Sequence, residues 1–180
     1  QLGLVAFHQG KLAPSLLSLL YFLQLENSTA RAGGVVTTME NILKGELSPA
    51  GTLAVPGETD DFSELEAILK AKVALNGKYK SKLDIQFDLV KQLQLFLEKL
   101  SYNAGDKGYW MQNYVPYFIS LQKEGYFEDY MYYSLEGVNN EVINSWLKKH
   151  KSSSYPYCSE SESWSSAFCW YSRFAEISLH

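Results

Sequence analysis

The apolar residues of this chain recur at helical spacing, and no window shows the strict alternation of apolar and polar residues that a half-buried strand requires. The longest example is a stripe of apolar side chains along one side of a predicted helix. Its members are Ile85, Leu89, Leu93, Phe96, Leu97 and Leu100. This pattern predicts an all-α fold of antiparallel helix hairpins, stacked as a right-handed superhelix or packed as an irregular bundle.

Polar stretches that contain glycine, proline or asparagine divide the chain into predicted helices. We expect these helices over residues 1–9, 13–26, 30–43, 60–74, 83–100, 109–123, 126–135, 141–150 and 164–177. Pro116 falls inside one of them, which predicts either a kink or a helix start near Val115. The second helix is apolar around most of its circumference, so it should be sandwiched between neighbours.

Polar residues at the predicted helix ends are the expected caps. Asn27-Ser28 should end the second helix and cap the third, and Asp60 or Asp61 should cap the helix at 60–74. Ser63 and Glu66 in that helix stand at the spacing of a capping box.

A double glycine, Gly33-Gly34, lies near the start of the third predicted helix and suggests that a neighbouring helix approaches closely there. Residues 46–59 form the clearest loop, since they contain two prolines and two glycines. We expect one all-helical domain over residues 1–180. It comprises a hairpin with the following helix (1–45), the loop (46–59) and further hairpins (60–180).

Charge and hydropathy exclude two classes of protein. The chain has 20 acidic and 16 basic residues, so it lacks the positive charge of a general nucleic-acid binder. No segment approaches the roughly 18 apolar residues of a membrane span. We therefore expect a soluble protein. Cys158 and Cys169 are compatible with one disulfide or with two thiols, so they do not decide between the cytoplasm and the periplasm.

The most specific pattern of the chain lies at its start, in residues 1–28. Its defining residues, in order, are Leu2, Gly3, Gly10, Ser15, Leu19 and Asn27. The spacing resembles the tetratricopeptide repeat, which has a Leu-Gly pair, a turn, a small residue, a large residue four positions later and then proline. Two positions depart from that repeat: Ala6 stands where tyrosine is usual, and Asn27 replaces the proline.

The order of elements resembles bacterial tetratricopeptide-repeat proteins, in which a divergent helical region follows the repeats. That resemblance implies a scaffold that binds another protein or peptide, with no catalysis and no cofactor. In this chain the divergent region would cover residues 60–180 and include residues 115–126, with the sequence VPYFISLQKEGY.

No motif of an enzyme or a metal site is present in the sequence. His8, His150 and His180 are the histidines of the chain, and none stands at a metal-ligand spacing from another. The Gly-rich phosphate loops and the nucleophile elbow are also missing. We therefore expect neither catalytic residues nor a metal ion.

Aromatic residues are the candidate binding groups, because Tyr and Trp are common anchors at interfaces. The candidates are Trp110, Tyr114, Tyr117, Tyr126, Tyr130 and Tyr133. Their helical spacing is equally typical of a core stripe. One alternative is a small-molecule-binding or hydrolytic domain with an aromatic pocket and Glu128 or Asp129 as its polar group. Another is self-association through the aromatic C-terminal half.

Overall fold

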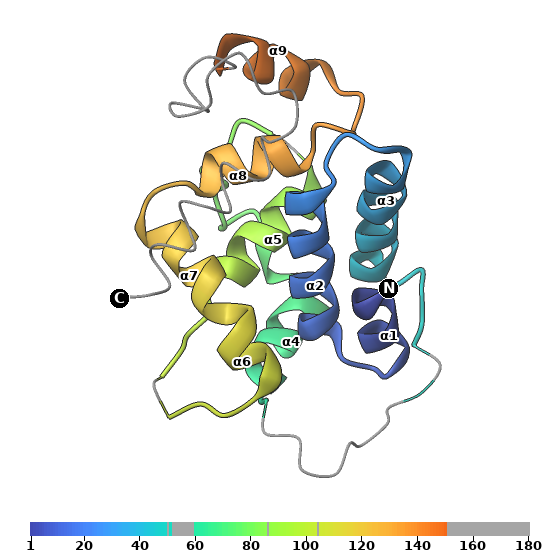
Figure 1. The fold of residues 1–180 in the computed structure, drawn as a ribbon, viewed down its shortest axis with the longest axis vertical. Coiled ribbons are helices and arrows are strands. Elements are labelled where there is room, and N and C mark those ends of the chain that lie inside the picture. The colour runs from blue at the N-terminus through green and yellow to red at the C-terminus, as the bar shows by residue number, and fades with distance from the viewer. Residues whose placement is uncertain (50, 52–59, 86, 104, 151–180) are drawn as a thin grey trace.

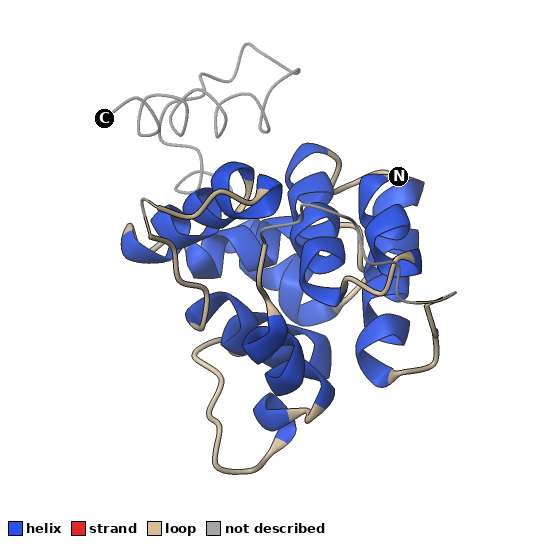
Figure 2. Ribbon diagram, turned by 90° about the horizontal axis from the view of Figure 1, so that it is seen from below, coloured by secondary structure: helices blue, strands red, loops and turns tan. Residues whose placement is uncertain are grey.

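A computed structural model describes residues 1–49, 51, 60–85, 87–103 and 105–150. Throughout these ranges the regular secondary structure is helical, and none of their residues lies in a strand (Figure 2). The predicted all-α class is thereby confirmed. None of the helices in these ranges is long and apolar enough to cross a bilayer. The predicted helix at 164–177 and both cysteines lie outside the described residues.

Helices on several sides surround the second helix (Figure 1). The elements are α1 (Leu2–His8), α2 (Leu12–Leu25), α3 (Ala30–Lys44), α4 (Ser63–Lys70), the 3-10 helix η1 (Val73–Leu75), α5 (Asp88–Glu98), α6 (Tyr109–Asn113), α7 (Val115–Lys123), α8 (Phe127–Ser134) and α9 (Glu141–His150). Residues 13–20 of α2 are all buried, because α1, α3, α4 and α8 pack against this helix. The prediction of a sandwiched second helix is confirmed.

The first hairpin depends on two glycines. Gly10 has a φ of +81°, a conformation that favours glycine and lets the chain reverse between α1 and α2. Gly3 faces α2, where an added Cβ would lie 2.7 Å from Leu19 Cγ and 3.1 Å from the Ser15 carbonyl oxygen. The two helices of the hairpin therefore approach each other closely at Gly3.

Two predicted helices are shorter than expected. Helix α5 begins at Asp88 rather than near residue 83, although Leu83 and Ile85 are buried. Gln94 stabilises the preceding turn in a non-helical conformation. Its Oε1 accepts from Ser81 Oγ and from the Lys82 N–H, both at 3.0 Å. These side-chain bonds give residues 81–83 an alternative to helical hydrogen bonds.

The prediction of one helix over residues 60–74 is also wrong. Helix α4 ends at Lys70, and Lys72 then adopts a left-handed conformation with a φ of +50° before η1 begins. By contrast, the predicted helix start near Val115 is confirmed. Helix α6 stops at Asn113, and α7 starts at Val115 with Pro116 in its first turn, where proline costs no helical hydrogen bond.

The cap of α3 is Thr29 rather than Asn27 or Ser28, since Thr29 Oγ1 accepts from the Ala32 N–H at 3.3 Å. Asn27 is buried and has a different role. Its Nδ2 donates to the Tyr133 carbonyl oxygen at 3.2 Å and to Glu136 Oε2 at 2.8 Å. Asn27 thus fastens the end of α2 to the end of α8.

The double glycine of α3 has no helix packed close against it. Nothing lies within 4 Å of a Cβ built on Gly34. A Cβ on Gly33 would lie 3.8 Å from the carbonyl oxygen of Gly137, which is an ordinary contact with the turn before α9. The predicted close helix neighbour is therefore wrong at both glycines.

Candidate functional site

The predicted aromatic binding surface is largely part of the core. Trp110, Tyr130 and Tyr133 are at most 7% exposed, so they cannot serve as exposed anchors. The other three candidates are half-buried: Tyr114, Tyr117 and Tyr126. The sequence pattern did not distinguish the buried candidates from the half-buried ones, because a core stripe and a binding stripe have the same spacing.

These tyrosines join α2 to the second half of the chain. The ring of Tyr21 in α2 packs edge-on against Tyr114 and Tyr117, with centroids 5.5 Å apart in both pairs. The Tyr130 hydroxyl donates to the Leu20 carbonyl oxygen at 2.8 Å. Burial raises the pKa of Tyr117 and of Tyr130 well above the ordinary tyrosine value. These contacts connect α2 to α7 and α8.

The carboxylate pair proposed for the alternative function lies on α8. Glu128 is exposed and Asp129 is half-buried. Burial raises the pKa of Asp129, and the charge of His150 opposes that rise. The ring of Trp146 stacks with Tyr132 and with His150, and the ring centroids are 4.2 Å apart in both pairs. This stack joins α8 to α9.

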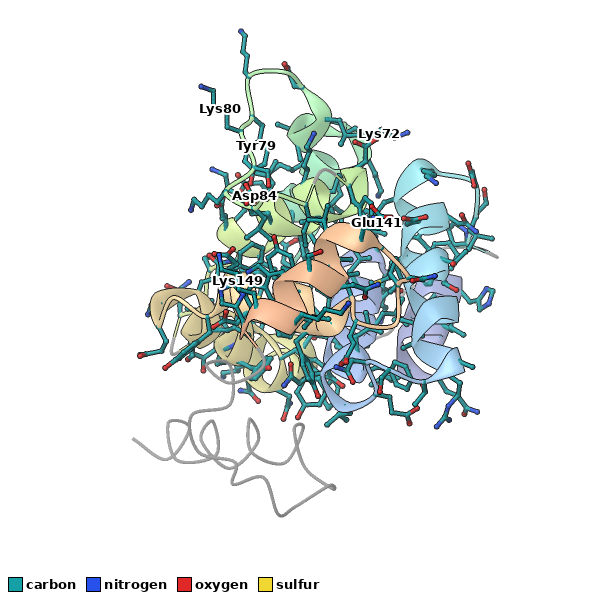
Figure 3. All side chains as sticks on the ribbon, turned by 90° about the horizontal axis from the view of Figure 1, so that it is seen from above. Lys72, Tyr79, Lys80, Asp84, Glu141 and Lys149 are labelled. Atoms are coloured by element: carbon teal, nitrogen blue, oxygen red, sulfur yellow. The ribbon has the colours of Figure 1, made fainter. Side chains whose placement is uncertain are left out.

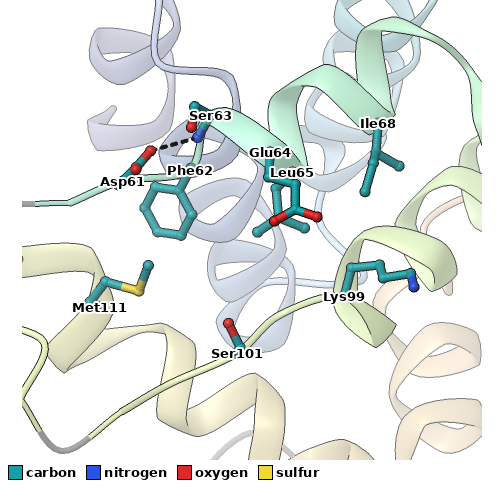
Figure 4. Close-up of a pocket in the computed structure, with 9 residues that line it drawn as sticks. All are labelled: Asp61, Phe62, Ser63, Glu64, Leu65, Ile68, Lys99, Ser101 and Met111. Carbon is teal, nitrogen blue, oxygen red and sulfur yellow. Dashed lines mark hydrogen bonds between the residues drawn. The ribbon is translucent and has the colours of Figure 1, made fainter.

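A pocket of about 220 Å³ lies between α4, the end of α5 and α6 (Figure 4). We call it the α4–α6 pocket. Its apolar lining consists of Phe62, Leu65, Ile68 and Met111. Its polar lining consists of Asp61, Ser63, Glu64, Lys99 and Ser101. None of the residues that the sequence nominated as binding groups lines this pocket.

One wall of the pocket is fixed by Asp60. Its carboxylate accepts from the Met111 N–H at 2.8 Å and from the Trp110 N–H at 3.3 Å, and so caps α6 rather than α4. The same carboxylate occupies the space that a Cβ on Gly108 would need. The chain entering α4 is thereby held against the start of α6.

A second carboxylate fixes α4 against the first hairpin. Glu66 Oε1 accepts from the Ala13 N–H at 3.0 Å and therefore caps the first turn of α2. The predicted capping box is wrong, because the N–H of Ser63 instead donates to Asp61 Oδ1 at 3.0 Å (Figure 4). That backbone hydrogen bond lowers the pKa of Asp61.

The two remaining charges of the pocket have no partner in the described structure. Glu64 and Lys99 are exposed and form no ion pair with another described residue. The segment that leads from α5 into α6 also exposes two aromatic rings. Tyr102 is 40% exposed and Tyr109 is 55% exposed. The arrangement suits an apolar group flanked by polar or charged groups.

Within the described residues no three His, Cys, Asp or Glu side chains gather as metal ligands would. The pocket residues come from three separate stretches of the chain, and no local motif marks Lys99, Ser101 or Met111 as neighbours of α4.

Comparisons of the chain with protein-family models, with curated proteins and with solved structures found no match.

Proposed function

We propose that this chain is a non-catalytic protein-interaction module of helical hairpins. It binds a short segment of a partner protein in the α4–α6 pocket. The observation that carries this proposal is the composition of the pocket: an apolar lining around Met111, next to the charges of Glu64 and Lys99, which form no ion pair with a described residue. Interfaces commonly combine one apolar anchor in a pocket with a polar rim.

The size of the pocket favours a peptide side chain over a small molecule. The volume of the pocket is about 220 Å³. Small-molecule sites are typically larger than this and begin at roughly 300 Å³. One apolar side chain of a bound segment would enter between Ile68 and Met111. Charged residues beside it in the partner would meet Glu64 and Lys99.

The first hairpin supports a scaffold of the tetratricopeptide type. Gly10 provides the left-handed turn, and Gly3 provides the tight contact with Ser15 and Leu19 that the resemblance implies. This contact is the kind that lets successive helices stack closely in such repeats. Membership in that family remains a proposal, and it rests on this one repeat unit.

Selection of peptides on the purified chain tests the proposal. A phage-displayed library of random dodecapeptides is panned on the protein, and enriched peptides are labelled and titrated by fluorescence anisotropy. The pocket variant Glu64→Gln/Lys99→Gln and the variant Met111→Ala should each raise the Kd of these peptides about tenfold, because they remove the charged rim and part of the apolar lining.

A matched control is available at the end of α7, where Glu124 and Lys123 are both exposed. The variant Glu124→Gln/Lys123→Gln makes the same change of composition without touching the pocket, and it should leave the Kd within about twofold. Circular dichroism verifies that every variant is folded. The pocket is not the binding site if the two double variants bind the enriched peptides equally.

A further inference from the structure

One segment of this acidic chain is strongly basic. Residues 67–83 contain five lysines and neither aspartate nor glutamate, although the whole chain has a net charge of −4. The lysines are Lys70, Lys72, Lys78, Lys80 and Lys82. The segment covers the end of α4, η1 and the turn that follows it.

The backbone of this segment turns two apolar side chains outward. Lys72 has a φ of +50°, which is uncommon for a residue with a side chain. In η1, which follows directly, Ala74 is 3% exposed and anchors the helix, whereas Val73 is 43% and Leu75 is 36% exposed. Two aliphatic side chains therefore face water between lysines on either side.

Three of the five lysines have no carboxylate partner among the described residues. Lys70 pairs with Glu66 at 3.4 Å, and Lys82 pairs with Glu98 at 2.8 Å. The remaining three are exposed and form no ion pair with a described residue: Lys72, Lys78 and Lys80. Figure 3 shows Lys72 and Lys80, which lie at the two ends of this run of lysines. We call residues 72–80 the basic turn.

Hydrogen bonds from Tyr79 and from Lys72 hold the basic turn in place. The Tyr79 hydroxyl donates to Glu98 Oε2 at 3.1 Å, and Gln94 Nε2 donates to Glu98 Oε1 at 3.0 Å. Lys72 Nζ donates to the carbonyl oxygen of Lys44 at 3.1 Å, whereas the ammonium groups of Lys78 and Lys80 make no such contact with a described residue. The charges of Lys78 and Lys80 are thus exposed on a turn that hydrogen bonds hold in place.

We propose that the basic turn binds the surface of a membrane that contains anionic lipids. Lys72, Lys78 and Lys80 would lie at the lipid phosphates and carboxylates, while Val73 and Leu75 would enter the region of the headgroups. The aliphatic pair favours this partner over a nucleic acid, which offers bases for aromatic stacking but no apolar layer. The binding is peripheral, and it is independent of the function proposed for the α4–α6 pocket.

Sedimentation of the full chain with vesicles tests this proposal. Large vesicles made of about two parts phosphatidylcholine to one part phosphatidylserine are compared with vesicles of phosphatidylcholine alone. Each lysine near an anionic surface contributes about fivefold to partitioning at low salt, so Lys72→Gln/Lys78→Gln/Lys80→Gln should weaken binding about a hundredfold. Val73→Ser/Leu75→Ser should also weaken it severalfold, and this loss should persist when salt screens the charges.

The matched control, Lys107→Gln/Lys123→Gln/Lys149→Gln, changes the net charge equally at three exposed lysines elsewhere, and it should bind nearly as well as the unmodified chain. Polyglutamate, which stands for an acidic protein, and single-stranded oligonucleotides, which stand for a nucleic acid, are tested as competitors of the vesicles. The proposal is overturned by equal binding to both kinds of vesicle, or by equal losses in the two lysine variants. It also fails if the serine variant binds like the unmodified chain, or if polyglutamate or oligonucleotides bind while vesicles do not.

Discussion

Gly3 and Gly34 both lie inside helices, and the same substitution should change stability in opposite directions at the two positions. Gly3→Ala places a methyl group 2.7 Å from Leu19 Cγ. This overpacking should destabilise the chain by about 1–2 kcal/mol. Gly34→Ala meets nothing within 4 Å. It should stabilise α3 by up to about 1 kcal/mol through helix propensity.

Thermal unfolding followed by circular dichroism measures both changes. The two variants have the same composition, so each serves as the control for the other. A higher melting temperature for Gly3→Ala would show that α1 does not pack tightly on α2.

Residues whose role is local could be predicted from the sequence. The turn at Gly10 and the small residues Gly3 and Ser15 follow from spacing within one hairpin. The burial of Tyr130 could not be predicted, because it arises when α8 packs on α2, where the Tyr130 hydroxyl reaches the carbonyl oxygen of Leu20, 110 positions away. Spacing identifies which side chains share a helix face, but it does not reveal whether another helix covers that face.

Helix α6 has only five residues, so its capping contributes much of its stability. Asp60→Ala removes the acceptor for the N–H groups of Trp110 and Met111. The loss of this cap should cost about 1–2 kcal/mol. Asp60→Asn retains one acceptor oxygen and should recover part of the loss. Hydrogen exchange of the Trp110 and Met111 amides should accelerate in Asp60→Ala and less so in Asp60→Asn. Unchanged exchange in both variants would contradict this role.

The helices were easier to predict than their ends. Periodicity located α2, α3 and α9 almost to the residue, because glycine, asparagine and proline mark their limits in the sequence itself. The late start of α5 depends on Gln94, a residue inside that helix, which bonds back to Ser81 and Lys82. Such a bond forms only after the chain folds back on itself, and a local pattern does not contain it.

The molecule as a whole should lose stability in alkali, because several of its tyrosines resist ionisation. Desolvation is the largest cause of the raised pKa values of Tyr79, Tyr114, Tyr117, Tyr130 and Tyr132. The unfolded chain releases these protons near pH 10, and the native chain releases them at higher pH. The native state therefore holds more protons above pH 10, and the free energy of unfolding falls as the pH rises.

Absorbance at 295 nm and circular dichroism at 222 nm, recorded together from pH 8 to pH 13, measure this effect. We expect exposed tyrosines to titrate first, followed by a cooperative rise in tyrosinate that coincides with the loss of helix. The chain unfolded in guanidinium chloride is the control and should titrate with one midpoint near pH 10. A gradual titration of all 13 tyrosines at that midpoint, with the helices intact, would contradict their burial.

The candidate site forms only when separate stretches of the whole molecule pack together, so the sequence predicted little of it. Asp61 and Glu64 were recognisable as acidic residues at a helix start. Their proximity to Lys99 and Met111 arises only when α5 and α6 pack beside α4. Of the aromatic residues that the sequence nominated, Trp110 and Tyr130 lie in the core, and Tyr114, Tyr117 and Tyr126 pack against it.

The contact between Asp60 and Gly108 also has a consequence for the evolution of this chain. With the Asp60 carboxylate in its present place, a side chain at position 108 would clash with it, so that the carboxylate would have to move and leave its bonds to α6. The two positions are therefore expected to change together, if at all. Distant relatives should be recognisable by an aspartate and a glycine about 48 positions apart, each beside a helix start, even where the rest of the sequence has diverged.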